Sequence, residues 1–416
     1  MLSPYIYTYS HYSPIDPGLN DRSWTVLGTL IGAVKRTGYD VGYGPSTKHV
    51  VSSSNALVEY NFAILRRFNG MECGIIGLQG VGKTTLFTAL TAHSVAVQIG
   101  SMKPNMGIAP IPDPRLAKIT EFIVAQKVIP ATLQVVDLPG VPSGGSNLNA
   151  VLAHIRNVDA LCHVVKCFDD GNPESDIDSM NSELIVADMV VVEGAIDKAE
   201  RTAKHGDKES QKRVDVLSRV NALLEEEKPA REGEWDESDR AILKSYGIMT
   251  AKPMLYVANV SEDDVSGDSN AANYVTSYAQ KNGGESVVVC ATLESEISEL
   301  DKNDQSDMLE SMGLVEPAVG PLARALNTLL GLSTFYTAGE KEVRAWPIPK
   351  EAPAPQAAGD IHSDIERGFI RAECYHVDDL FSLSSEKAIK EAGKLRSEGK
   401  NYTMQDGDVV NFLFNV

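Results

Sequence analysis

The sequence predicts an α/β protein with a mainly parallel sheet, and three observations lead to that fold class. A glycine-rich loop joins a short apolar run to a helical pattern at residues 73–90. Helical patterns alternate with further strand-like runs, which is typical of a parallel sheet with crossover helices. Polar motifs stand directly after these runs, where ligands bind in such sheets. The predicted strands are Thr132–Asp137, Leu161–Lys166, Met254–Asn259 and Ser286–Cys290.

Composition is ordinary for a soluble globular protein, with 43% hydrophobic and 23% charged residues in 416. That length allows two or three domains, and no apolar run is long enough to span a membrane. The net charge of −19 argues against nucleic-acid binding through overall positive charge but leaves room for a local basic patch. We interpret the five scattered cysteines as small buried hydrophobes in a reducing compartment.

The glycine-rich loop satisfies the complete pattern G-x-x-x-x-G-K-S/T from Gly77 to Thr84. Glycines let consecutive N–H groups turn towards one anion, and the helix N-terminus adds the positive end of its dipole. We expect Lys83 to reach the β- and γ-phosphates and the Thr84 hydroxyl to hold Mg²⁺. The loop therefore predicts nucleotide binding. The alternative is a turn that merely joins a strand to a helix.

Two further motifs extend the predicted site. The DLPG segment from Asp137 to Gly140 reads as D-x-x-G, whose carboxylate would hold Mg²⁺ through water and whose glycine N–H would sense the γ-phosphate. The NVSE segment from Asn259 to Glu262 stands where guanine-specific proteins have N-K-x-D. Because Lys is absent and Glu replaces Asp, this segment favours ATP, or a relaxed choice between ATP and GTP. An acidic loop without nucleotide contact is the alternative.

The regions outside this core differ from it. Residues 1–70 are rich in Tyr, Ser and Gly and poor in acids, so we expect an unstructured or poorly folded extension. A mispredicted start and a cleaved targeting segment are the alternatives. At about 182–230, two charge-rich runs predict either an antiparallel helical hairpin or two surface helices. Gly206 would be the C′ residue of the first and Asp207 the N-cap of the second.

The C-terminal region predicts a small, separate β-rich domain at 333–416 that ends in the strand 409–416. A proline-rich stretch within this region indicates a linker-like or irregular segment, and a short α+β pattern follows it. Its prolines are Pro347, Pro349, Pro353 and Pro355.

Several longer segments resemble the Obg-like ATPase (YchF) family. They are GIIGLQGVGKTTLFTALT, KPNMGIAPIPDPRL, DLPG, KPMLYVANVSEDD, LESEISELD, GFIRAECYHVDDL and EAGKLRSEGKNYTMQDGDVVNFLFNV. The resemblance covers essentially Met71–Val416. It implies a P-loop G domain at 71–332 with an inserted α-helical coiled-coil arm, and a TGS domain of β-grasp type at 333–416.

The resemblance also implies a function. It implies ATP in preference to GTP, slow hydrolysis that needs Mg²⁺, and association with ribosomes in translation or stress regulation. The resemblance also allows contact with RNA through the TGS and G domains. The implied location is the cytoplasm, with organellar targeting by residues 1–70 left open.

By position, the family's functional residues fall on five segments of this chain. Catalysis is assigned to Lys83 and Gly140, and Mg²⁺ to Thr84, Asp137 and the switch I hydroxyl of Ser101. Nucleotide contact is assigned to Gln79, Gly80, Val81, Gly82, Lys83, Thr84, Thr85, Asn259, Glu262, Cys290, Ala291 and Thr292.

The chain departs from the family pattern at several positions. Gly80 stands where the family usually has an Asn that ligates K⁺ in related cation-activated enzymes, which makes potassium stimulation doubtful. Lys103 replaces an acid, and the switch II segment after Gly140 is several residues shorter. Like the family, the chain lacks an evident water-orienting Gln, because the apolar Val141 follows Gly140, so we expect slow turnover resting on phosphate clamping and Mg²⁺. The alternatives are a non-hydrolysing ATP-bound scaffold and a variant that uses GTP.

Overall fold

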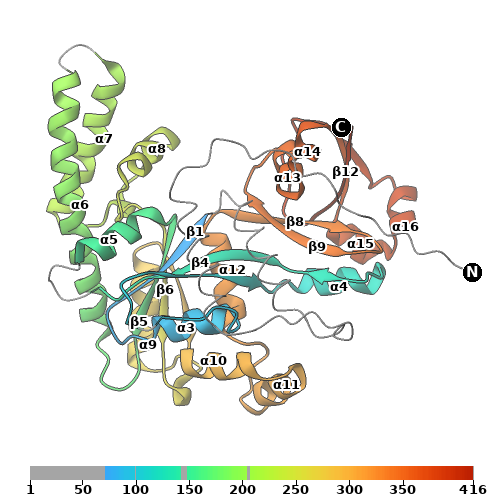
Figure 1. The fold of residues 1–416 in the computed structure, drawn as a ribbon, viewed down its shortest axis with the longest axis horizontal. Coiled ribbons are helices and arrows are strands. Elements are labelled where there is room, and N and C mark those ends of the chain that lie inside the picture. Colours follow the sequence, from blue (N-terminus) through green and yellow to red (C-terminus); the bar gives the residue numbers. More distant parts are fainter. Residues whose placement is uncertain (1–70, 99, 142–147, 204–206, 416) are drawn as a thin grey trace, which may run out of the picture. The chain divides into compact units, whose positions relative to one another are not determined.

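The computed structural model describes residues 71–98, 100–141, 148–203 and 207–415. The predicted N-terminal extension, the predicted C′ residue Gly206 and residues 142–147 of the short switch II segment lie outside these residues. Elements carry the labels of Figure 1.

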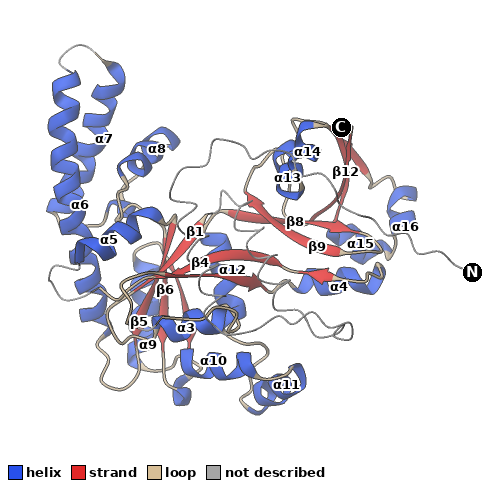
Figure 2. Ribbon diagram, viewed as in Figure 1, coloured by secondary structure: helices blue, strands red, loops and turns tan. Residues whose placement is uncertain are grey.

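The described strands form two six-stranded sheets, drawn in red in Figure 2. The first has the order β2-β4-β1-β5-β6-β7, and all neighbours are parallel except β2 and β4. This confirms the mainly parallel sheet. Its strands are β1 (Glu72–Ile76), β2 (Asn105–Ile111), β4 (Ala131–Asp137), β5 (Ala160–Lys166), β6 (Met254–Asn259) and β7 (Glu285–Val289).

The antiparallel edge strand β2 was not predicted from the sequence. Gly107 and Pro110 interrupt the apolar pattern, and both residue types are depleted in strands. Proline is tolerated here because β2 lies at the edge of the sheet, where one side of the strand needs no hydrogen-bond donors. The strand brings its first residue, Asn105, opposite the end of β4.

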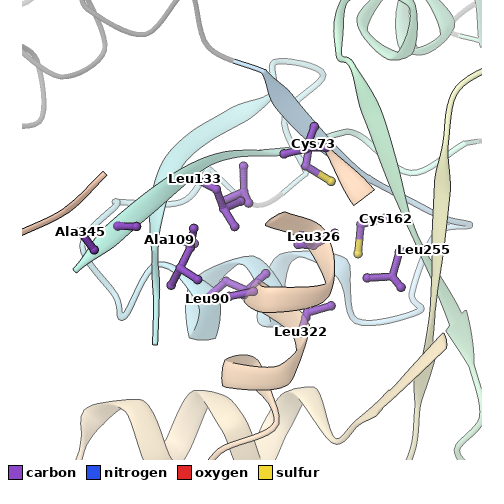
Figure 3. Close-up of a cluster of buried hydrophobic side chains, with 14 of the residues drawn as sticks. Cys73, Leu90, Ala109, Leu133, Cys162, Leu255, Leu322, Leu326 and Ala345 are labelled. Atoms are coloured by element: carbon purple, nitrogen blue, oxygen red, sulfur yellow. The ribbon is translucent and has the colours of Figure 1, made fainter. Parts of the chain in front are cut away.

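Helices cover both faces of the first sheet. The core of one face joins side chains of β1, β4 and β5 to α3 (Lys83–Leu90) and α12 (Val319–Leu329), as Figure 3 shows. The other face packs on α5 (Leu148–Asn157), α9 (Asn270–Lys281) and the first turns of α6 (Pro173–Ala203). All five cysteines are free and buried, as predicted. The remaining helices beside this sheet are α4 (Pro114–Phe122), α10 (Ala291–Glu299) and α11 (Lys302–Ser311).

The predicted helical hairpin is built by α6 (Pro173–Ala203) and α7 (Lys208–Glu225), which lie side by side in Figure 1. They share an apolar cluster with α8 (Glu237–Tyr246) and the 3-10 helix η1 (Ala230–Glu232). Asp207 caps α7, because its carboxylate accepts the Ser210 N–H at 3.1 Å. Helix α6 begins well before the predicted residue 182, because its first turns cover the sheet.

The second sheet has the order β11-β10-β12-β8-β9-β3. Its strands are β3 (Val128–Ile129), β8 (Leu332–Ala338), β9 (Val343–Pro349), β10 (Phe369–His376), β11 (Arg396–Glu398) and β12 (Asp408–Phe414). Its helices are α13 (Ala354–Ile361), α14 (Ser363–Arg367), α15 (Val377–Leu383) and α16 (Glu386–Glu391).

The expectation of an irregular proline-rich stretch is wrong. Pro347 and Pro349 belong to β9, where they pair with β8, and Pro353 directly precedes α13. On its other side β9 pairs with β3 only at Val343 and Arg344, so the missing proline N–H groups break no ladder.

One apolar cluster runs from the first sheet into the second. It joins Leu133 of β4 and Leu322 of α12 to Tyr336 of β8 and Val409 of β12. The short strand β3 also pairs with β9 in the second sheet, although in sequence it lies among the elements of the first sheet. The domain boundary at 332–333 therefore stays a prediction. None of the helices in the described part of the chain has the length and apolarity that crossing a membrane requires.

Candidate nucleotide-binding site

The loop between β1 and α3 has a backbone that only glycine adopts without strain. Gly80 and Gly82 have φ angles of 83° and 91°. A Cβ on Gly77 would lie 2.5 Å from the Val164 carbonyl oxygen. Because α3 begins at Lys83, the free N–H groups and the positive dipole end of this helix adjoin the loop. This local structure suits an anion such as a phosphate.

The Lys83 ammonium is buried over this loop. Its side chain is 7% exposed, and Nζ donates to the Leu78 carbonyl oxygen at 2.6 Å. Burial lowers the pKa of Lys83 to about 8, although the nearby Asp137 carboxylate acts in the opposite direction. A neutral carbonyl compensates a buried cation only in part, so a phosphate oxygen would be a stronger partner.

The D-x-x-G segment lies directly against the phosphate loop. The Val141 N–H donates to the Gly77 carbonyl at 3.3 Å. A Cβ on Gly140 would lie 3.0 Å from Gln79 Cα and 3.2 Å from Lys83 Nζ, so a side chain there would displace the loop. Among the described residues 137–141, Asp137 alone has a polar side chain, and Val141 is buried.

Thr84 and Asp137 form the candidate Mg²⁺ site. The Thr84 hydroxyl donates to Asp137 Oδ2 at 2.9 Å, and Asp137 is 4% exposed. The other carboxylate oxygen, Oδ1, is buried and has no hydrogen-bond partner among the described residues. Hydroxyl and carboxylate oxygens are the ligands that Mg²⁺ prefers, and the unpartnered Oδ1 could accept from a metal-bound water. These residues therefore fit the ion.

Ser101, the third predicted metal residue, does not join them. Its hydroxyl accepts the Lys103 N–H at 3.0 Å, within its own turn. Asn105, which the sequence analysis missed, donates instead to Asp137 Oδ2 at 3.0 Å. Only the pairing of β2 with β4 reveals this residue, because nothing in its sequence neighbourhood marks it.

A cavity of about 520 Å³ lies beside the phosphate loop and would hold the base. Phe168 and Asp169, at the end of β5, line it and were not singled out from the sequence. The predicted nucleotide residues that line it are Gly80, Gly82, Thr85, Asn259, Glu262, Cys290, Ala291 and Thr292.

Asn259 is held by main-chain groups on both sides. Its Nδ2 donates to the Val81 carbonyl at 2.9 Å, and its Oδ1 accepts the Ala291 N–H at 2.9 Å. The side chain thus ties the phosphate loop to the segment behind the base. Glu262 lies in the exposed 3-10 helix η2 (Glu262–Asp264), at the rim of the cavity.

Three predicted positions can act only in restricted ways. Val81 is buried in the apolar core, so only its main chain could touch a nucleotide. Gln79 is exposed and is absent from the residues that line the base cavity. Gly80 has no side-chain oxygen, so the K⁺ ligand described by the resemblance is missing there. The roles of all predicted site residues stay predictions.

Two family models match the chain. Residues 72–193 match a family described as 50S ribosome-binding GTPase. Residues 332–415 match the YchF-GTPase C-terminal family, described as a protein of unknown function. The two matches fall on the parts of the chain that hold the phosphate loop and the second sheet.

Similar proteins match over nearly their whole length. The chain is 44% identical over 365 residues to the ribosome-binding ATPase YchF of Bacillus subtilis, covering 83% of this chain and all of that protein. It is 40% identical over 363 residues to the Escherichia coli O157:H7 protein of the same name, again covering 83% and 100%. The solved Schizosaccharomyces pombe YchF GTPase is 28% identical, with a TM-score of 0.74 over 83% of this chain and 98% of that one. With this identity and coverage, the chain belongs to the YchF family of P-loop proteins.

Proposed function

We propose that this chain is an ATP-binding P-loop switch that hydrolyses its nucleotide slowly and works with Mg²⁺. The observation that carries the proposal is the buried cluster at the phosphate loop. In it the Lys83 ammonium, the Thr84 hydroxyl and the unpartnered Asp137 Oδ1 lie at the phosphate loop, which supports the roles that they would have toward a Mg²⁺-bound triphosphate. The relatives' name, ribosome-binding ATPase, supports the same activity.

The base end of the site supports ATP over GTP. In guanine-specific proteins an aspartate accepts from the N1–H and 2-amino groups of guanine, and adenine lacks that 2-amino group. This chain has Glu262 at that position, on an exposed 3-10 helix, and no lysine within its NVSE segment. The cavity wall behind the base is formed by Cys290 and Ala291 at the start of α10.

Slow turnover follows from what the D-x-x-G segment lacks. Gly140 and Val141 bring no polar side chain to the phosphate end, so no side chain of the described segment 138–141 could orient an attacking water. Lys83 and the bound ion would then stabilise the transferring phosphoryl group by charge alone. When bound, Mg²⁺ supplies Lewis-acid stabilisation, while Thr84 and Asp137 hold and orient it.

We also propose the ribosome as the partner, in the cytoplasm. The relatives' name supports it, and so does a basic cavity of about 750 Å³ beside α8 and the start of β6. In a chain of net charge −19, five cations but only two acids line this cavity. The cations are Arg156, Arg231, Arg240, Lys244 and Lys252, and the acids are Asp159 and Glu285. Such a concentration of positive charge suits the phosphates of RNA.

The direct test is nucleotide binding and single-turnover hydrolysis by the full chain, comparing ATP with GTP and K⁺ with Na⁺. We expect Mg²⁺-dependent ATP binding, weaker GTP binding and slow turnover that does not respond to K⁺. Tight ATP binding without turnover would favour the second candidate, an ATP-occupied scaffold, which the apolar Val141 supports. Preferential GTP binding would overturn the ATP assignment, and failure to bind either nucleotide would overturn the proposal.

A further inference from the structure

The side chain of Asn105 connects two parts of the site that the sequence motifs leave apart. Asn105 is the first residue of β2, and its antiparallel partner is Asp137, the last residue of β4. Directly opposed residues in an antiparallel pair direct their side chains to the same face of the sheet. The fold itself therefore brings this amide to the carboxylate that would serve Mg²⁺.

Both ends of the amide are used. Nδ2 donates to Asp137 Oδ2 at 3.0 Å, and Oδ1 accepts the Gln98 N–H at 3.1 Å. A carboxylate can only accept here and a main-chain N–H can only donate, so these two partners together fix the orientation of the amide. One side chain thus links the metal-side carboxylate to the loop that carries Ser101.

The same carboxylate oxygen also accepts the Thr84 hydroxyl, at 2.9 Å. A hydroxyl that ligates Mg²⁺ uses an oxygen lone pair, so Thr84 can keep donating its proton to Oδ2 while it holds the ion, and the Asn105 amide can keep its contact as well. The amide would then continue to hold Oδ2, and the plane of the carboxylate would direct the free Oδ1 towards the ion's water. Outer partners of this kind orient the groups that serve a metal and set its affinity.

The Ser101 hydroxyl, which the resemblance assigns to Mg²⁺ itself, accepts the Lys103 N–H within its own turn. Asn105 is therefore the residue of this segment that contacts the metal-side cluster directly. We propose that Asn105 is a positioning residue: it orients Asp137 for Mg²⁺ and couples the main chain at Gln98 to the occupancy of the metal site. The inference rests on the proposed ATP- and Mg²⁺-dependent function and deepens it.

The test replaces Asn105 with leucine, which has nearly the same shape and no polar atoms, in the full-length chain. The probe is a fluorescent ATP analogue titrated with Mg²⁺. We expect the half-saturating Mg²⁺ concentration to rise about 10- to 100-fold. Binding of the analogue without Mg²⁺ should change less than about twofold, because the Asn105 side chain bonds to Asp137 and the Gln98 N–H and does not line the base cavity. The matched control is Asn303→Leu, at an exposed position on α11.

A second readout separates positioning from simple support of the fold. Hydrogen exchange of the Gln98 amide should become faster in Asn105→Leu, and Mg²⁺ with nucleotide should no longer protect residues 98–103. If Asn105→Leu does not fold, Gln98→Pro serves in its place, since it removes the N–H donor, together with an exposed side chain, at a loop position. That variant should lose the Mg²⁺-dependent protection of the segment 100–103 and raise the Mg²⁺ requirement by a smaller factor.

The outcomes are distinguishable. If Mg²⁺ does not strengthen ATP binding in the parent chain, the proposed function fails and the inference fails with it. If Mg²⁺ does so in the parent, an unchanged Mg²⁺ requirement in folded Asn105→Leu overturns the inference alone. Retained protection of residues 100–103 in Gln98→Pro would overturn the coupling in the same way.

Discussion

The two ends of the nucleotide site are built in different ways. At the phosphate end, Lys83 and Asp137 are 7% and 4% exposed, and each has specific partners. At the base end, Glu262 and Thr292 are exposed, and the interior contacts are made by main-chain groups such as the Ala291 N–H. Buried charges interact strongly because water is excluded, whereas exposed charges are screened. Substitutions at the phosphate end should therefore have the larger effects.

The largest effect is expected from Lys83→Ala. This change removes the buried ammonium that would face the β- and γ-phosphates, and removal of one such charged donor costs roughly 100- to 1,000-fold in rate. Single-turnover hydrolysis and ATP affinity, measured with Mg²⁺, test it. The control is Lys302→Ala, at an exposed position on α11. Hydrolysis within a few-fold of the parent would show that the loop does not hold the triphosphate.

Asn259→Ala should break the connection between the two ends. It leaves the Val81 carbonyl and the Ala291 N–H buried without their partner, at about 1–3 kcal/mol each. Urea unfolding should show a lower free energy of unfolding, and affinity for both nucleotides should fall together. Asn273→Ala is the control, because that exposed side chain on α9 donates to the Asp268 carbonyl at the surface. A stability equal to the parent's would mean that the two ends are independent.

The contrast between the ends also explains what the sequence could predict. A phosphate loop needs glycines at fixed positions followed by Lys-Thr, so its strand, turn and helix were predictable from one stretch of chain. Asp137 was predictable for the same reason, since an apolar strand precedes it. Asn105 was not, because its role depends on an antiparallel pairing between residues distant in sequence.

The rest of the fold shows the same limit. Pro347 and Pro349 suggested an irregular stretch, because proline has no N–H group and is rare in strands. In the sheet, however, β9 pairs with β8 on one side and only briefly with β3 on the other, so the missing N–H groups cost no hydrogen bonds between strands. Helix α6 was placed too late for a related reason. Its first turns pack on the sheet through Ile177 and Met180, a tertiary contact that periodicity alone does not show.

ATP affinity should depend on pH through the phosphate end. The pKa of Lys83 is lowered to about 8 without nucleotide, and a bound phosphate would raise it. Above pH 8 the free protein loses the proton that binding requires, so affinity should fall by about tenfold for each further pH unit and should change little between pH 6 and 7.5. Titrations of the ATP analogue from pH 6 to 9.5 measure this fall. Lys83→Arg keeps its charge throughout, so a similar fall in that variant would exclude Lys83 as its cause.

The smallest effect is expected at the base end. Glu262→Ala removes one exposed carboxylate from the rim of the base cavity, and a single hydrogen bond at a wet site contributes about 1 kcal/mol, or roughly fivefold. The ratio of ATP to GTP affinity should therefore shift by about that factor, while hydrolysis of bound ATP stays unchanged because Lys83 and Asp137 are untouched. Asp263→Ala, the neighbouring carboxylate on the same 3-10 helix, is the matched control. An equal shift in both variants would mean that the loop acts through its net charge, and base selection would then rest on the main-chain groups at Cys290 and Ala291.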